Sequence, residues 1–119
     1  MLVLSHKALD IYQLSLKLIK SIYLLTKTFP REEKYTLISQ LQRASISVSS
    51  NIAEGSARFS KPERRRFYEI ARSSLVEIDT QLEVALILNY CGKDNLFDIE
   101  ELIEATFRKI SKMISNLRE

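Results

Sequence analysis

Apolar residues recur at intervals of three and four positions along most of the chain, which is the pattern of helices that bury one face. This pattern is interrupted at Phe29-Pro30, at Gly55 and at Cys91-Gly92. The segments between these breaks predict four helices, over residues 8–28, 32–54, 61–91 and 95–118. Short connections favour neighbouring helices that run in opposite directions, so we expect an all-α, antiparallel up-down four-helix bundle.

The predicted core consists of the apolar and small residues that share one face of each helix. In the first two helices these residues are Ile11, Leu14, Leu18, Ile22, Leu25, Ile38, Leu41, Ser45, Val48 and Ile52. In the last two helices they are Phe67, Ala71, Ser74, Ile78, Leu82, Ala85, Ile99, Ile103, Thr106, Ile110, Met113 and Leu117. Each set fits a helix that packs against its neighbours around a common core.

Local signals indicate where the helices begin and end. Ser60 and Glu63 have the spacing of a capping box at the start of the third helix, in which the Ser60 hydroxyl accepts a hydrogen bond from the Glu63 N–H while the Glu63 side chain reaches back. Gly55 is expected to end the second helix in the left-handed conformation. The pair Asp94-Asn95 is expected to cap the start of the fourth helix.

Two helices carry more apolar residues than one buried face requires. The segment from Val84 to Cys91 is apolar on nearly every side, and the first helix, residues 8–28, is similarly broad. A bundle helix normally shows a polar face to water, so this excess predicts either unusually deep burial or a second packing surface. We favour a second packing surface, and therefore a homo-oligomer. The alternative is that the stems of lysine and glutamate side chains cover the excess.

Polar residues form a continuous stripe along the second helix. They follow spacings of three and four and are Gln40, Arg43, Ser47, Asn51 and Glu54. One interpretation is a plain solvated face. The other is an ordered polar network or subunit interface, in which Glu54 or Asn51 meets an arginine of the same or a neighbouring subunit. The candidate arginines are Arg43, Arg58 and Arg72.

The stretch QLQRASISVSSNIAEG, residues 40–55, resembles the signature of the four-helix-bundle proteins encoded in intervening sequences of bacterial 23S rRNA genes. This group is also called the S23 ribosomal protein family, and the block NIAEG at the end of the stretch is its most specific part. The similarity covers nearly the whole chain, because it continues through Arg58, Phe67, residues 70–75, Glu77 and residues 80–82 and includes the Phe29-Pro30 break. Ser73 departs from the pattern, since many relatives are expected to carry glycine there.

The resemblance implies an antiparallel four-helix fold, a ring-shaped homopentamer and an association with nucleic acid. Related small bundles look like accessory proteins of diversity-generating retroelements, which bind a reverse transcriptase and nucleic acid. The implied partners are therefore further copies of the chain, RNA or DNA, and a reverse transcriptase. The resemblance implies no enzymatic activity and does not make the chain a component of the ribosome.

The start of the third helix lies in a basic segment. Residues 56–75 contain six basic and two acidic residues, a net charge of +4 that exceeds the +3 of the whole chain. The basic residues are Arg58, Lys61, Arg64, Arg65, Arg66 and Arg72. Basic side chains at a helix N-terminus can bind phosphate, which makes these six the candidate nucleic-acid-binding residues. The alternative is that several of them pair with acids or are simply solvated, since arginines at a helix N-terminus oppose the helix dipole.

Side chains suited to catalysis are scarce. His6 is the only histidine and Cys91 the only cysteine, so the chain cannot build a ferritin-like di-iron site or a histidine-based nucleophile system. We therefore expect no enzymatic activity, no catalytic residue, no metal and no cofactor. A single cysteine fits the reducing cytoplasm, and neither a signal peptide nor a membrane span is expected.

These features predict one domain, residues 1–119, that works as a non-enzymatic homo-oligomer in the cytoplasm. The predicted function is an association with nucleic acid through the basic residues at the start of the third helix. The alternative is a scaffold or adaptor for another protein, for example a reverse transcriptase, without direct binding of nucleic acid.

Overall fold

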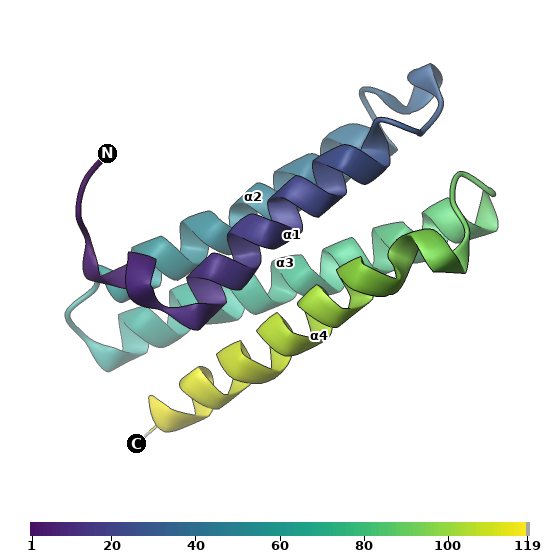
Figure 1. Ribbon diagram of the computed structural model, residues 1–119. Helices are drawn as coiled ribbons and strands as arrows, with labels where there is room; N and C mark the ends of the chain where they lie inside the picture. The colour runs from purple at the N-terminus through teal and green to yellow at the C-terminus, as the bar shows by residue number, and fades with distance from the viewer. Residues whose placement is uncertain (119) are drawn as a thin grey trace.

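The computed structural model describes residues 1–118, and all regular structure in this part of the chain is helical (Figure 1). Four long helices are present: α1 (Asp10–Thr26), α2 (Leu37–Ser56), α3 (Lys61–Ile87) and α4 (Lys93–Asn116). Two short 3-10 helices, η1 (Ser5–Ala8) and η2 (Arg31–Glu33), precede α1 and α2. The prediction of an all-α chain with four helices is confirmed.

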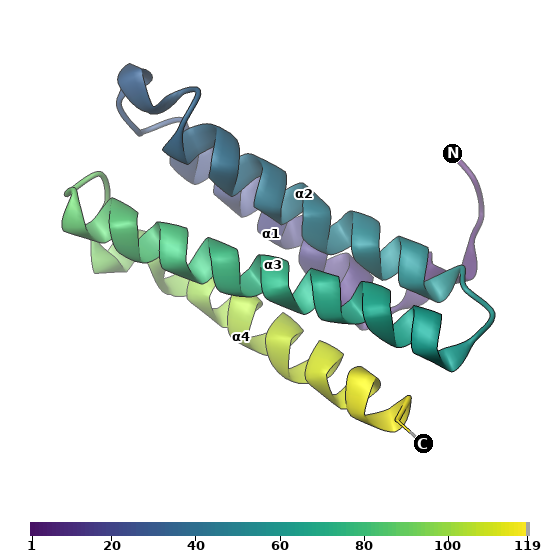
Figure 2. The same ribbon diagram turned by 180° about the vertical axis from the view of Figure 1, so that it is seen from behind.

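The four helices surround one core. α2 packs most extensively against α3, while α1 packs against α2 and α4, so α1 and α3 lie across the core from each other. The N-terminus, the α2–α3 turn and the end of α4 lie at one end of the bundle, and the other two connections lie at the opposite end (Figures 1 and 2). No helix in residues 1–118 combines the length and the apolar character that a membrane crossing requires.

The observed core agrees with most of the predicted positions, and it extends onto their neighbours. Tyr68, Leu75 and Ile114 are buried although the sequence pattern did not select them. The predicted core residues that are only half-buried are Leu14, Ile38, Phe67, Met113 and Leu117. The largest fully buried side chains are Leu18, Ile22, Leu41, Ile52, Leu75, Ile78, Leu96, Ile110 and Ile114. Burial of one such side chain stabilises the fold by about 1.5–3 kcal/mol. The misplaced positions follow from the periodicity, because a helix of 3.6 residues per turn drifts away from a seven-residue repeat.

α2 begins at Leu37, later than the predicted residue 32. Residues 31–33 form the separate 3-10 helix, and the backbone of Thr36, with φ −119° and ψ −103°, interrupts the helical path. The Glu33 carboxylate accepts hydrogen bonds from the Thr36 hydroxyl and from the Tyr90 hydroxyl, the latter at 2.6 Å. Thr36 and Tyr90 together hold the pKa of Glu33 below its ordinary value. Glu33 therefore makes its hydrogen bonds in the connection before α2 instead of lying in the first turn of that helix.

α3 ends at Ile87 rather than at residue 91, because Asn89 adopts the left-handed conformation with φ 60°. The Tyr90 N–H donates to the Ala85 carbonyl at 2.9 Å and the Asn89 N–H to the Leu86 carbonyl at 3.0 Å. This is the pair of hydrogen bonds that defines a Schellman motif, with asparagine in the position that glycine usually takes.

Gly92 and Asn95 form the start of α4. Gly92 is the residue that precedes the helix, and its N–H donates to the Asn95 side-chain oxygen at 2.8 Å. The prediction that Asp94-Asn95 caps the helix is therefore wrong by two or three positions. Asn95 contributes from inside the first turn, as the third residue of a capping box does.

Gly55 does not adopt the left-handed conformation, so the predicted reason for a glycine there is wrong. It lies inside α2 and is buried against α3. A Cβ atom at this position would lie 2.8 Å from Cε1 of Tyr68 and 3.2 Å from the Arg64 carbonyl oxygen. The glycine is required because the two helices approach each other too closely for any side chain.

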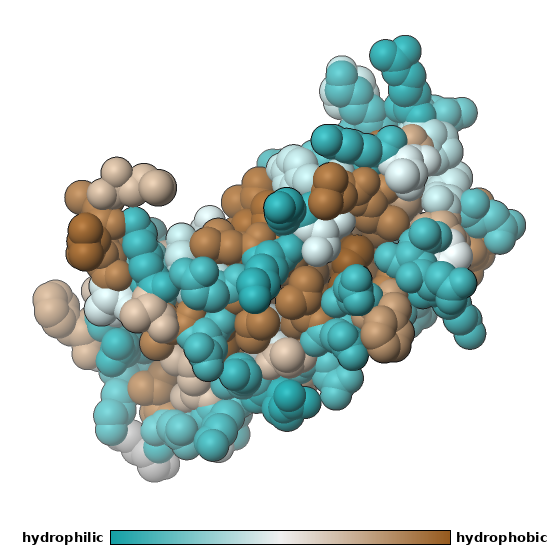
Figure 3. All heavy atoms as spheres, in the orientation of Figure 1, coloured by the Kyte–Doolittle hydropathy of each residue, from teal (hydrophilic) through white to brown (hydrophobic). Residues whose placement is uncertain are grey.

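The apolar excess of α1 and α3 reaches the surface instead of being deeply buried. Ile87 is 77% exposed, Leu24 is 54% exposed, and Val84 and Leu88 are also exposed. Figure 3 shows apolar side chains at the surface over the face that α1 and α4 form. The side-chain stems of lysine and glutamate do not cover this excess. Homo-oligomerisation, which the excess predicts, stays a prediction.

Candidate nucleic-acid interface

The bundle carries opposite charge on the two halves of the α3–α4 pair. Residues 56–72 contain six basic and two acidic residues, and residues 108–118 contain four basic residues and no acidic one. Residues 73–107, in contrast, contain eight acidic residues and one lysine. The basic residues of α3 and α4 lie at the same end of the bundle, beside the α2–α3 turn (Figure 2). We call this region, residues 56–72 with residues 108–118, the basic end.

Two contacts join the two helices within the basic end. Arg65 donates to the Leu117 carbonyl oxygen at 3.4 Å, and Arg72 donates to the Ser111 hydroxyl at 3.3 Å. α4 therefore adds four basic residues that the sequence reasoning did not select: Arg108, Lys109, Lys112 and Arg118. The signal in the sequence was a run without acidic residues from 108 to 118. Its relevance depended on a contact with α3, which no local pattern reveals.

Three of the six predicted arginines and lysines are partly engaged within the fold. Arg58 forms an ion pair with Glu54 at 2.9 Å, and Arg65 lies 3.6 Å from a carboxylate oxygen of Glu69. Arg72 is half-buried and lies 5.9 Å from the centre of the Phe107 ring. The two ion pairs are exposed pairs within one helix, which contribute only a few tenths of a kcal/mol. They hold the side chains in place without removing the excess of positive charge.

Lys61 and Arg66 are exposed, and neither has a carboxylate partner among residues 1–118. Arg66 lies 5.7 Å from the centre of the Phe67 ring, and Arg58 lies over the same ring at 4.8 Å. Arg64 is half-buried, and its Nε atom is buried without a hydrogen-bond partner in the described part of the chain. The side chains best placed to meet an anion in solvent are therefore Lys61 and Arg66.

The start of α3 is capped by Ser60, as predicted, but within residues 1–118 the Glu63 side chain does not make the predicted return hydrogen bond to the Ser60 N–H. The Ser60 hydroxyl accepts a hydrogen bond from the Glu63 N–H at 3.3 Å, and Pro62 occupies the first turn. The proline has no N–H to satisfy there. The capped turn therefore places Lys61 next to the run from Arg64 to Arg66 at a defined helix start.

The polar stripe of α2 divides into an ordered part and a solvated part. Ser47 and Ser74 of α3 share a hydrogen bond between their hydroxyl groups at 2.9 Å. Asn51 donates to the Ser47 carbonyl at 2.8 Å. Gln40 and Arg43, in contrast, are exposed. Part of the stripe is therefore hydrogen-bonded within the bundle, and part of it is solvated.

The arginine that meets the polar stripe is Arg58, which pairs with Glu54. This ion pair is exposed and lies within one helix turn of the same subunit, so a role of the stripe at a subunit interface stays a prediction. A small cavity of about 330 Å³ lies beside the N-terminal part of the stripe and is bordered by Gln40, Arg43 and Gln81. The Gln81 side-chain oxygen is buried there without a partner among residues 1–118.

Two further side chains with reactive groups, Cys91 and His6, lie outside the basic end. Burial raises the pKa of the Cys91 thiol, which keeps it in the protonated, weakly nucleophilic form. The His6 ring packs edge-on against Tyr12 at 4.7 Å between the ring centres. Within residues 1–118 no three His, Cys, Asp or Glu side chains lie close enough to hold a metal ion.

Comparison with known proteins gives one clear relationship. No curated protein matches the chain. The family model described as 23S rRNA-intervening sequence protein matches residues 7–116. This match includes all four helices, the polar stripe of α2 and most of the basic end. The chain therefore belongs to the 23S rRNA-intervening sequence protein family.

Proposed function

We propose that this protein is a non-enzymatic, ring-shaped homo-oligomer of antiparallel bundles that binds the phosphate backbone of RNA or DNA through its basic end. The observation that carries the proposal is the convergence of α3 and α4, which joins two separate basic segments of the sequence. A positive region of this kind attracts polyanions whatever their sequence, because it contacts phosphates rather than base edges. Binding with little sequence preference is expected.

Oligomerisation would multiply the effect of each basic end. One basic end offers a few phosphate contacts, which give weak binding at physiological salt. A ring repeats the same contacts around its axis, so one nucleic-acid strand can engage several subunits and gain avidity. The exposed apolar side chains of α1 and α3 support self-association. The family resemblance favours a pentamer.

The binding site is tested by removing exposed charges from the basic end. The variant Lys61→Ala/Arg66→Ala/Lys112→Ala removes three basic side chains that are exposed in the structure. We expect weaker binding to single-stranded RNA or DNA, measured by fluorescence anisotropy at several salt concentrations. The slope of log K against log salt should become shallower by about 2 per subunit, since each lost contact with a single strand removes about 0.7.

A matched control separates the site from general charge. The variant Arg31→Ala/Lys34→Ala/Lys93→Ala also removes three exposed basic residues, but these lie at the opposite end of the bundle, in the α1–α2 connection and at the first residue of α4. It should bind almost as well as the wild type. Equal loss of binding in both variants would show that net charge, rather than the basic end, attracts the nucleic acid.

A scaffold for another protein is the second candidate function. It is favoured by the exposed apolar side chains near the end of α3, of which Ile87 is the most exposed at 77%. A neighbouring hollow of about 490 Å³ between α2 and α3 is bordered by Leu37, Val84 and Leu88. Affinity purification after nuclease treatment would distinguish the two functions. A stable protein partner that is lost in Ile87→Asp, with no bound nucleic acid, would support the scaffold.

A further inference from the structure

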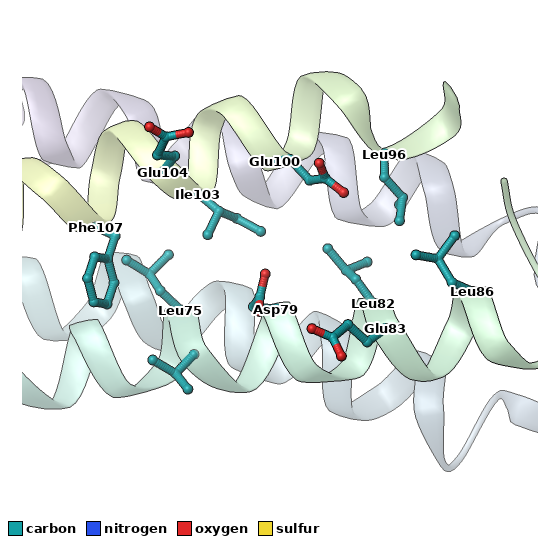
Figure 4. Close-up of a pocket in the computed structure, with 11 residues that line it drawn as sticks. Leu75, Asp79, Leu82, Glu83, Leu86, Leu96, Glu100, Ile103, Glu104 and Phe107 are labelled. Atoms are coloured by element: carbon teal, nitrogen blue, oxygen red, sulfur yellow. The ribbon is translucent and has the colours of Figure 1, made fainter. Parts of the chain in front are cut away.

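The outer surface of the α3–α4 pair contains an acidic groove with an apolar floor. The groove has a volume of about 650 Å³. Its floor includes Leu75, Leu82, Leu86, Leu96, Ile103 and Phe107. Four carboxylates line the same groove, and none of the lining residues is basic: Asp79 and Glu83 come from α3, and Glu100 and Glu104 from α4. Figure 4 shows the apolar side chains between the two helices, with Asp79 and Glu100 pointing towards this space and Glu83 and Glu104 lying over α3 and α4 at its edges.

The fold itself leaves most of this negative charge uncompensated. Of the four carboxylates that line the groove, only Glu104 has a basic partner within residues 1–118. This partner is Arg108, at 3.5 Å, and the ion pair is exposed. No three of the acidic side chains in the described chain are close enough to share a metal ion. The groove therefore has two properties that a partner must match, its negative charge and its apolar floor. A suitable partner carries several positive charges spread along its length and apolar side chains that contact the floor.

The outer face of α1 has these two properties. Leu16 and Leu24 are 40% and 54% exposed, and Tyr23 is also exposed. Lys20 and Lys27 lie on the same face, because positions 16, 20, 23, 24 and 27 recur at intervals of three and four. Asp10 is the only acidic residue of α1, so the rest of the helix carries no negative charge. We call Leu16, Lys20, Tyr23, Leu24 and Lys27 the α1 ridge.

The α1 ridge and the groove also match in length. The ridge extends from residue 16 to residue 27 and the groove along α3 from residue 75 to residue 86, about 16 Å in each case at 1.5 Å per residue. α1 lies across the core from α3 and its ridge faces outwards, so it cannot enter the groove of its own chain. The occupant must therefore come from another molecule.

We propose that the α1 ridge of one copy of this chain docks into the acidic groove between α3 and α4 of the next copy. This inference rests on the proposed homo-oligomer and identifies the two surfaces that form its interface. Because the surfaces differ, the contact is head-to-tail, and repetition of it produces a closed ring or an open chain rather than an isolated dimer. The contact leaves the basic end free to meet nucleic acid.

Charge reversal tests the pairing. The ridge variant is Lys20→Glu/Lys27→Glu, the groove variant is Asp79→Lys/Glu83→Lys, and the swapped variant carries all four changes. All four side chains are exposed, so the fold should persist, which circular dichroism checks. By light scattering we expect the ridge and groove variants to be monomers and the swapped variant to regain the subunit number of the wild type, since it restores opposite charges.

Control variants reverse equal charges elsewhere on the surface. Lys34→Glu/Lys93→Glu and Glu32→Lys/Glu101→Lys lie outside both surfaces and should keep the subunit number of the wild type. An oligomer that persists in the ridge or groove variant, or a swapped variant that stays monomeric, would overturn the pairing while the proposed homo-oligomer stands. A monomeric wild type would overturn both.

Discussion

At the scale of single residues, Gly55 and Tyr68 determine how closely α2 and α3 approach. Tyr68 is 2% exposed, and its hydroxyl shares a hydrogen bond with Ser56 at 2.8 Å. Its ring lies where a side chain at position 55 would extend. Gly55 belongs to the most specific block of the family resemblance, and the contact gives a physical reason for a glycine there.

The variant Gly55→Ala should destabilise the protein, although alanine normally stabilises a helix by about 1 kcal/mol relative to glycine. The added methyl group would meet the buried Tyr68 ring at 2.8 Å and force the helices apart. Overpacking of this kind costs about 1–3 kcal/mol. Urea unfolding measures the difference, with the exposed Ser50→Ala on the same helix as control. A variant more stable than the wild type would show that the space is larger than the structure indicates.

The hydrogen bond between Tyr90 and Glu33 predicts a dependence on pH. The Thr36 hydroxyl and then the Tyr90 hydroxyl lower the pKa of Glu33 from its ordinary value of 4.5. Because the folded state has the lower pKa, this carboxylate stabilises the fold above its ordinary pKa, and the contribution is lost as the pH falls through the lowered value. In Tyr90→Phe the pKa of Glu33 should rise towards 4.5, so the contribution of this carboxylate to stability becomes smaller and its loss is complete at a higher pH.

NMR titration of the Glu33 carboxyl group measures this shift directly. Tyr35→Phe is the control. This substitution also removes a tyrosine hydroxyl close to Glu33 in the sequence, but Tyr35 is 84% exposed. It should leave the pKa of Glu33 unchanged. An unchanged pKa of Glu33 in Tyr90→Phe would show that the two side chains do not hydrogen-bond in solution.

At the scale of secondary-structure elements, the start of α3 matters most, because it positions the candidate binding residues. The Ser60 hydroxyl satisfies the Glu63 N–H, and loss of such a cap typically costs about 1 kcal/mol. Ser60→Ala should lower the free energy of unfolding by that amount, whereas Ser60→Asp, which can also cap, should stay close to the wild type. Chemical denaturation of the three proteins provides the test, and equal stability of all three would exclude a capping role.

The number and the approximate positions of the four helices could be predicted from the sequence, whereas some of the residues at which they end could not. The Ser60 cap follows from a local pattern, and the structure confirms it. Asn89 was missed because glycine is the usual residue for the left-handed end of a helix, and Gly92 stands close by. Gly55 was misinterpreted for the same reason, since its role depends on Tyr68, which lies in another helix. The contribution of α4 to the basic end also depends on tertiary packing.

At the scale of the whole molecule, charge and apolar surface are distributed unevenly. Basic residues gather at one end of the α3–α4 pair, while the groove between the same two helices is acidic and has an apolar floor. The α1 ridge has the opposite charge and lies on a different face. A head-to-tail ring would bury the apolar surfaces and repeat the basic end around its axis.

Light scattering during size-exclusion chromatography of the purified protein, with the ultraviolet absorbance ratio recorded on the same peak, tests the central claim most directly. It determines the subunit number and any co-purifying nucleic acid together. We expect a pentamer of 13.8 kDa subunits, with an absorbance ratio raised by bound nucleic acid that falls when the salt concentration is increased. A monomer of 13.8 kDa that carries no nucleic acid at low salt would contradict the claim.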